Sequence, residues 1–190
     1  MNKPLIDSDK VLFFDFDDTI AATEPAHAKA RDMVLKPFGV TIDDWSSYIG
    51  IPDIEIFKAI KTQYHLRIDI PAIVHQKLLL SKEHLIESGV QPIPQVKEYI
   101  TQLPNTKYVL TGQDREFTLF FLKRWGLVGY FADIISLVGS SVSKAEKIIE
   151  MGILPEKAVL FEDSERIITA ATAKGIRCIR VKKDGSIQGI

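Results

Sequence analysis

The chain has 190 residues, of which 46% are hydrophobic, and a formal net charge of -1. This length suits one compact domain, or one domain with a modest insertion, and the hydrophobic content is enough for a full core. The near balance of 24 basic and 25 acidic residues argues against a dedicated nucleic-acid binder. The single cysteine, Cys178, excludes an internal disulfide framework and a cysteine-rich zinc site.

The opening residues, MNKPLIDSDK, lack the apolar segment of a secretory signal peptide. The sequence also has no run of about 18 apolar residues that would predict a transmembrane helix. We therefore expect a soluble, cytoplasmic protein that binds neither nucleic acid nor a membrane.

Short apolar runs predict the strands of a sheet. The first, Val11–Phe14, is apolar on both faces, as is typical of a central parallel strand covered on both sides. Similar runs follow at residues 108–110, 134–138, 158–161 and 176–181. From the second run onward they alternate with helical patterns that end at glycines. This alternation predicts an α/β fold with a doubly wound parallel sheet.

The interval between the first two strands is far longer than an ordinary crossover connection. It carries several stretches with apolar residues at helical spacing. We interpret residues 20–92 as a helical subdomain, inserted into an α/β core that comprises residues 1–19 and 93–190.

The first strand ends in a run of aspartates that includes Asp15, Asp17 and Asp18. Strand alternation places Asp15 and Asp17 roughly on the same side of an extended chain. Such a pair offers oxygen ligands that suit Mg2+, a hard cation. An acidic turn facing solvent would show the same spacing.

Two other strands also end in polar residues. Thr111 and Gly112 end the second strand, where a hydroxyl group and a backbone amide can hold a phosphate. Glu162 and Asp163 end the fourth strand, although an acidic residue before a helix is also a common capping signal.

These strand ends are expected to meet. Sites in open parallel sheets form beyond the carboxyl ends of the strands, at the topological switch point. Asp15, Thr111 and Asp163 all occupy such ends, and Lys144 opens the helix before the fourth strand. The constellation predicts a magnesium-phosphate site, in which the lysine offsets the charge of the aspartates and of the phosphoryl oxygens.

The ordered set of motifs resembles that of the haloacid dehalogenase (HAD) superfamily of hydrolases, from about Val11 to Val181. The inserted helices resemble the α-helical cap of that family. The segments that flank the inserted helices resemble its phosphoglycolate phosphatase and β-phosphoglucomutase branch. The motifs are Asp15-Phe16-Asp17-Asp18-Thr19, Thr111, Lys144 and Glu162-Asp163. The flanking segments are Thr23-Glu24-Pro25 and Gly89-Val90-Gln91-Pro92-Ile93-Pro94.

The resemblance implies the catalytic roles. Asp15 would be the nucleophile that forms an aspartyl-phosphate, and Asp17 the general acid and then the general base. Lys144 would orient Asp15 and offset charge, with Lys147 as its competitor for that role. Because dehalogenases and phosphonoacetaldehyde hydrolases lack an aspartate at the position of Asp17, its presence points to phosphate esters. Asp18 is a departure from the family pattern, since glycine is commoner there.

The resemblance also implies the ligand-binding roles. The Asp15 carboxylate, the backbone carbonyl of Asp17 and Asp163 would hold Mg2+, with Glu162 as a further candidate. Thr111 and the Gly112 amide would bind the phosphoryl oxygens of a small phosphorylated substrate.

Three functions stay open at this point. One is a phosphatase acting on a small metabolite, and the second is a phosphomutase of the same fold. The third, a receiver domain switched by aspartate phosphorylation, is disfavoured by the large helical insert. The cap loop Ile49–Asp53 is a plain turn or a substrate-selecting loop. In the second case Ile51 and Pro52 favour a small or partly apolar substrate. The sequence does not predict an oligomeric state.

Overall fold

The computed structural model describes residues 6–48 and 50–189 of the chain. The chain divides into two compact units, one of which comprises Met1–Ala22 with Gln91–Ile190, and the other Thr23–Val90.

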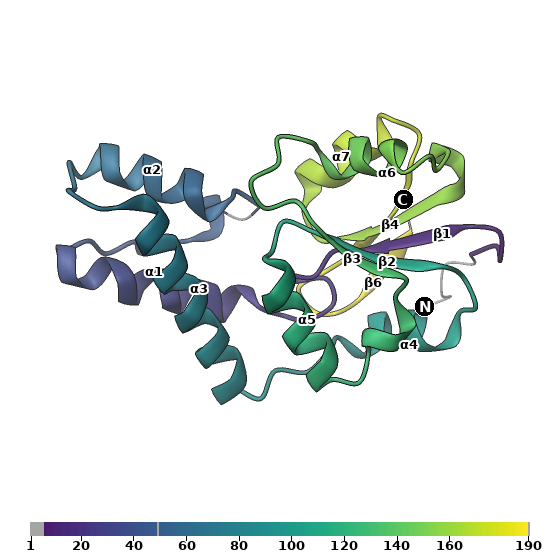
Figure 1. Ribbon diagram of the computed structural model, residues 1–190, viewed down its shortest axis with the longest axis horizontal. Coiled ribbons are helices and arrows are strands. Elements are labelled where there is room, and N and C mark those ends of the chain that lie inside the picture. The colour runs from purple at the N-terminus through teal and green to yellow at the C-terminus, as the bar shows by residue number, and fades with distance from the viewer. Residues whose placement is uncertain (1–5, 49, 190) are drawn as a thin grey trace. The chain divides into compact units, whose positions relative to one another are not determined.

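The first unit is built on a six-stranded sheet with the strand order β3-β2-β1-β4-β5-β6 (Figure 1). The five strands β1 to β5 are parallel, and β6 pairs antiparallel with β5. This topology confirms the predicted α/β fold, whereas the short edge strand β6 was not predicted. The strands are β1 (Val11–Phe14), β2 (Lys107–Thr111), β3 (Asp133–Ser136), β4 (Ala158–Glu162), β5 (Arg177–Val181) and β6 (Ile187–Gly189).

Helices cover both faces of this sheet (Figure 1). Phe13 packs with residues of α6 (Lys144–Glu150) and α7 (Glu165–Thr172) on one face. Its neighbour Phe14 stacks on Phe161, which contacts Tyr99 of α4 (Pro94–Gln102) on the other face. Helix α5 (Arg115–Arg124) lies on the same side as α4. Neighbouring residues of a strand point to opposite faces, so Phe13 and Phe14 show that β1 is covered on both sides. This is typical of an inner strand of a parallel sheet.

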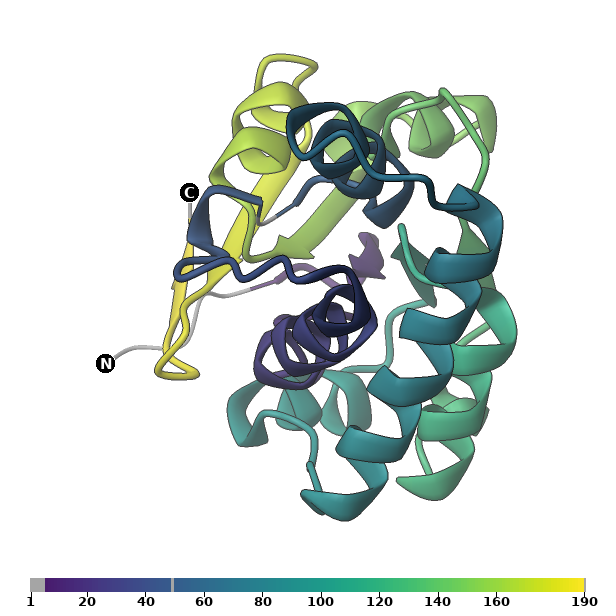
Figure 2. The same cartoon turned by 90° about the vertical axis from the view of Figure 1, so that its left-hand side faces the viewer.

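The second unit is helical and contains α1 (Glu24–Leu35), α2 (Asp53–Gln63) and α3 (Ile70–Glu87) (Figure 2). Its apolar core includes Val34, Trp45 and Phe57, and α3 packs against α1 and α2. Short 3-10 helices complete both units, at Lys36–Phe38, Ser46–Tyr48, Val128–Tyr130 and Pro155–Lys157.

Within the described ranges, no helix combines the length and the hydropathy that a membrane span needs.

Candidate active site

The site lies in the first unit, where the chain order of the sheet reverses. From β1 the sheet continues through β2 and β3 on one side and through β4 and β5 on the other. In open α/β sheets, ligands bind beyond the carboxyl ends of the strands at such a point. The backbone amide of Asp15 donates to the Phe161 carbonyl at 3.0 Å, which continues the β1–β4 pairing by one residue. Asp15 is thereby placed beside Glu162 and Asp163.

Aromatic contacts of Phe16 fix the loop that follows β1. Phe16 is fully buried, stacks on Trp125 at a centroid distance of 5.9 Å and meets Phe117 edge-on at 6.1 Å. Its carbonyl accepts a hydrogen bond from the Ile20 amide at 2.9 Å, which turns the chain back. Asp18 in this turn has a φ of 51°, a left-handed conformation that aspartate tolerates better than most residues. The left-handed backbone explains why glycine is favoured at this position.

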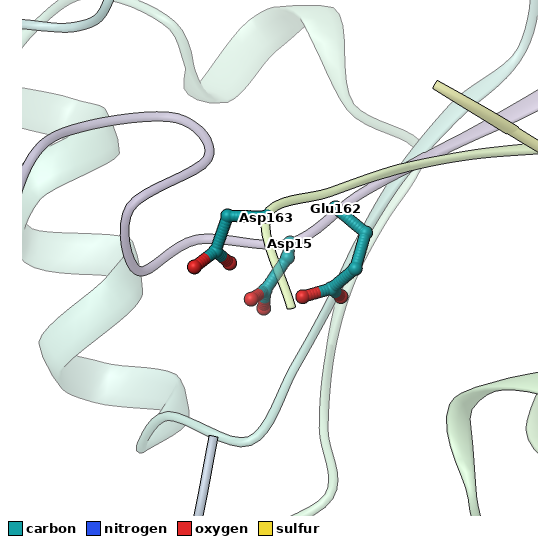
Figure 3. A group of neighbouring side chains, drawn as sticks. All are labelled: Asp15, Glu162 and Asp163. Atoms are coloured by element: carbon teal, nitrogen blue, oxygen red, sulfur yellow. The ribbon is translucent and has the colours of Figure 1, made fainter. Parts of the chain in front are cut away.

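Three carboxylates converge at the ends of β1 and β4 (Figure 3). Asp15, Glu162 and Asp163 each offer one oxygen, and these oxygens lie within 4.8 Å of one another. Asp15 is 8% exposed and Glu162 is fully buried. An all-oxygen donor set of this kind fits a hard divalent cation such as Mg2+.

The protonation of this cluster also fits a cation site. Burial raises the pKa of Asp15 to about 7, and the nearby charges of Glu162 and Asp17 add to this while Lys144 opposes it. Burial, with repulsion from Glu162 and Asp15, raises the pKa of Asp163 to about 9. Bound cationic charge favours the ionised form of such carboxyl groups. The raised pKa values therefore mark a place where a bound cation would stabilise the ionised carboxylates, which agrees with the all-oxygen donor set.

Lys144 is the cation that the chain itself supplies to this cluster. Its Nζ lies 2.7 Å from Oδ1 of Asp15 and 2.6 Å from Oε2 of Glu162. Burial lowers the pKa of Lys144, but the charges of Asp15 and Glu162 outweigh it and leave the pKa above its usual value. A capping box between Ser143 and Glu146 fixes the start of α6. The lysine is therefore a cation held on a fixed helix end.

Lys147, the second candidate lysine, pairs with a different carboxylate. Lys147 lies 3.3 Å from the exposed carboxylate of Glu150 on the same helix. Of the two lysines that the sequence offered for one role, the structure brings Lys144 to Asp15.

Glu162 has both of its oxygens engaged. Oε2 accepts from Lys144, and Oε1 accepts from the backbone amide of Ser164 at 3.1 Å. Asp163 is approached by Thr19, whose hydroxyl donates to Oδ1 at 3.5 Å. Glu162 therefore holds the lysine in place, and Thr19 is a partner of the cluster that the sequence did not single out.

At the end of β2, Thr111 is buried and its Oγ1 accepts from the backbone amide of Gln113 at 3.1 Å. Gly112 is exposed, and a Cβ atom added there would meet no atom within 4 Å outside its chain neighbours. The Gly112 backbone is thus bordered by open space at the carboxyl end of β2, next to β1.

Asp17 differs from the other site carboxylates. Its side chain is not one of the three that cluster in the described chain, and its Oδ2 accepts from the side-chain amide of Gln113 at 3.0 Å. Sequence reasoning missed Gln113. The available signal was a polar side chain directly after Thr111-Gly112 at a strand end.

The helical unit holds a buried polar cluster of its own. Asp53 accepts from Nε of Arg31 at 3.0 Å and lies 2.6 Å from Nζ of Lys77. The same lysine lies 2.9 Å from Nδ1 of His27, and Arg31 also pairs with Glu24 at 2.7 Å. Asp53 thus has a structural role inside this unit.

The sequence leaves two interpretations of the loop Ile49–Asp53, a turn or a substrate-selecting loop. Ile49 lies outside the described residues. Pro52 is the N-cap of α2, and Asp53 is the first residue of that helix.

The fold and this site together define an α/β enzyme with an acidic, lysine-supported centre at the switch point of its sheet. The family model described as "Haloacid dehalogenase-like hydrolase" matches residues 12–181, and the chain belongs to this family. The family resemblance of the sequence motifs is therefore confirmed.

Curated relatives and solved structures agree with this membership. The chain is 30% identical over 182 residues to the fructose-1-phosphate phosphatase YqaB of Escherichia coli K12, covering 90% of this chain and 95% of the relative. It is 24% identical to a phosphoglycolate phosphatase of Aliivibrio fischeri, covering 87% and 81%. The crystal structure of CbbY from Rhodobacter sphaeroides in complex with phosphate shares the fold, with a TM-score of 0.75, 20% identity, and coverage of 91% and 86%.

Proposed function

We propose that the protein is a magnesium-dependent phosphatase that hydrolyses a small phosphorylated metabolite through an aspartyl-phosphate intermediate. The observation that carries this proposal is the Asp15 carboxylate, bound by Lys144 at 2.7 Å within a three-carboxylate cluster at the switch point of the sheet. The two curated relatives are both phosphatases, which supports a phosphate monoester as the substrate.

In the first chemical step, a carboxylate oxygen of Asp15 attacks phosphorus, and the bond from phosphorus to the alcohol oxygen breaks. Lys144 fixes the orientation of the attacking carboxylate. Asp17 donates its proton to the leaving alkoxide. Thr111 and the Gly112 amide bind phosphoryl oxygens, in line with the importance of positioning and charge neutralisation in phosphoryl transfer.

In the second step, Asp17 takes a proton from water, and that water attacks phosphorus. The bond from phosphorus to Asp15 breaks, which regenerates the carboxylate and releases inorganic phosphate. The Asp15 and Asp163 carboxylates and the Asp17 carbonyl are the residues that would hold Mg2+. When bound, this ion neutralises charge on the phosphoryl oxygens.

The remaining sequence predictions are part of the same proposal. The α/β core of residues 1–19 and 93–190 carries the chemistry, and the helical region 20–92 acts as the cap that selects the substrate. The protein is expected to work in the cytoplasm without nucleic acid or membrane as a partner.

The test is phosphate release from a panel of sugar phosphates, phosphoglycolate and nucleotides, with Mg2+ and after chelation. We expect magnesium-dependent release by the wild type and a loss of at least about a thousandfold in Asp15→Asn, which lacks the nucleophile. Asp9→Asn is the matched control, because Asp9 is an exposed partner of Lys157. Release that survives Asp15→Asn or exhaustive chelation would refute the mechanism. Activity that needs a sugar bisphosphate would identify the phosphomutase alternative.

A further inference from the structure

The side chain of Gln113 is held in one orientation beside Asp17. Its Oε1 accepts from the backbone amide of Asp114 at 2.9 Å, and its Nε2 donates to Oδ2 of Asp17 at 3.0 Å. Because a backbone amide can only donate, the oxygen of Gln113 must face it. The amino group of Gln113 is therefore the part that faces Asp17.

The backbone of Gln113 is fixed as well. Its amide donates to Oγ1 of Thr111 at 3.1 Å, and its carbonyl accepts from Oγ of Ser136 at 2.7 Å. The next residue, Asp114, caps α5 by accepting from the Phe117 amide at 2.9 Å. The backbone that carries the Gln113 side chain is thus held by the ends of β2 and β3 and by the start of α5.

We infer that Gln113 is a positioning residue for the general acid-base Asp17, and that it works by donating one hydrogen bond to Oδ2 of that side chain. This inference rests on the proposed phosphatase function. In this role Gln113 acts through Asp17 and does not itself transfer a proton.

The hydrogen bond acts on Asp17 while this residue gives up its proton. Oδ2 of Asp17 accepts from Gln113, and in the proposed mechanism Asp17 passes its proton to the leaving oxygen. As the proton leaves, the O–H bond of Asp17 breaks and an O–H bond of the alcohol forms, while negative charge develops on the carboxylate. A donor bond strengthens as its acceptor becomes charged. The contact therefore stabilises the transition state more than the ground state.

Two substitutions of Gln113 distinguish the positioning of Asp17 from support of the backbone at Asp114. Gln113→Glu keeps an oxygen for the Asp114 amide but replaces the donor to Asp17 by an acceptor. Gln113→Met removes the polar contacts with Asp17 and with the Asp114 amide at similar volume. Gln188→Met is the matched control, because Gln188 is an exposed glutamine on the edge strand β6.

The readout is kcat/KM for an alkyl phosphate and for p-nitrophenyl phosphate, whose weakly basic leaving group needs less proton donation. Losing a hydrogen bond to a charged group corresponds to roughly a 10- to 100-fold loss. We expect a loss in this range on the alkyl phosphate in both Gln113 variants, and a clearly smaller loss on the aryl phosphate. In an Asp17→Ala background, Gln113→Met should cause no further loss on p-nitrophenyl phosphate.

Several results would overturn the inference. They are equal losses on both substrates, wild-type activity in Gln113→Glu, or a full additive loss in the Asp17→Ala background. Each of these leaves the proposed function intact, because the wild type is active in all three. A wild type that releases no phosphate from any substrate would refute the proposed function itself.

Discussion

Lys144 is a buried cation whose removal should affect both the stability of the protein and the proposed chemistry. It lies between two carboxylates, Asp15 and Glu162, and is 7% exposed. Transferring these charges from water to the interior costs free energy, which the ion pairs and hydrogen bonds offset only when the geometry is good. Removing the lysine would leave two buried carboxylates without their cation. The lysine that we propose to orient Asp15 for attack is therefore also needed for the stability of the carboxyl end of the sheet.

The first prediction compares the two lysines of α6. Lys144→Met should lower kcat/KM by at least about a hundredfold, because it removes the positive charge next to the developing negative charge. Lys147→Met should stay within about twofold of the wild type, since it breaks only an exposed pair with Glu150. The measurement is phosphate release by protein whose fold is checked by circular dichroism.

Losing a buried partner also costs about 3 to 5 kcal/mol of stability. If Lys144→Met does not fold, Lys144→Arg, which keeps the charge on a bulkier group, supplies the activity comparison. Full activity in both Lys144 variants would contradict the role of this lysine.

The second prediction concerns Asp17. An alkyl phosphate leaves as a strongly basic alkoxide and needs a proton, whereas p-nitrophenolate needs it less. General acid catalysis contributes roughly 100- to 10,000-fold, or about 3 to 5 kcal/mol of barrier. Asp17→Asn should lose most of this in kcat/KM for an alkyl phosphate and clearly less for p-nitrophenyl phosphate.

The interpretation of this contrast requires that phosphoryl transfer, and not hydrolysis of the aspartyl-phosphate, limits kcat/KM. Equal losses on both substrates would mean that Asp17 is mainly structural or positions the metal. No loss on either substrate would rule out this mechanism.

At the scale of the elements, the central strand and the crossovers on either side of it were readable from the sequence. Val11–Phe14 is apolar at every position because both faces of β1 are covered, and burial on both faces leaves an unbroken apolar run. The edge strand β6 was missed because Ile187–Gly189 has only three residues and carries no apolar run. The other edge strand, β3, was predicted because Ile134 and Ile135 begin such a run. Local patterns therefore predicted the strands that carry an apolar run, and not the short one without it.

The candidate site also contains residues that could be predicted from the sequence and contacts that could not. The strand-end residues Asp15, Thr111 and Asp163 were predictable because parallel strands bring their carboxyl ends to one edge. The side-chain bond between Gln113 and Asp17 joins positions that are 96 apart in sequence, and it depends on a rotamer. No spacing rule encodes such a bond. The same holds for the contact of Arg31 with Asp53 in the helical unit, which joins positions that are 22 apart in sequence.

The third prediction tests the polar cluster of the helical unit. Asp53 pairs with Arg31 and with Lys77, which is 2% exposed. Burial raises the pKa of Asp53, but the charges of Lys77 and Arg31 outweigh this and hold it below its usual value. Asp53→Asn leaves two cations without their common partner and should destabilise the protein by about 3 kcal/mol. Asp43→Asn, an exposed aspartate of the same unit, should change stability by less than about 0.5 kcal/mol.

The measurement for this third prediction is urea unfolding followed by far-UV circular dichroism, with hydrogen exchange of α1, α2 and α3 to locate the effect. Unchanged stability and unchanged exchange in Asp53→Asn would contradict the structural role of the cluster.

At the scale of the whole molecule, the near-zero net charge hides a strong local imbalance. The chain carries a formal net charge of -1, yet three carboxylates meet at the ends of β1 and β4 with one lysine among them. Repulsion within this group opposes folding whenever all its members are ionised. Global stability is therefore expected to depend on pH and on divalent cations through this one place.

The fourth prediction is that dependence. The pKa of Asp163 is about 9 in the folded protein, against about 3.9 in an unfolded chain. Between these values the folded state binds the proton more tightly, so this group's contribution to stability falls as the pH rises toward 9. Asp15, with a folded pKa of about 7, acts in the same direction. In the presence of a chelator, the Tm should therefore fall between about pH 5 and pH 8.

Asp163→Asn mimics the protonated side chain and isolates this effect. With the chelator, its Tm should exceed that of the wild type near pH 8 by an amount that corresponds to at most about 4 kcal/mol, and approach it near pH 5. Mg2+ at about 100 times its Kd should stabilise the wild type by about 2.7 kcal/mol. This gain should be largest at high pH, where protons compete least for the carboxylates, and should be reduced in Asp163→Asn. Asp9→Asn, which alters an exposed ion pair, should keep the wild-type response. A pH profile and a magnesium response that are the same in Asp163→Asn and in the wild type would show that this carboxylate neither opposes folding nor binds the cation.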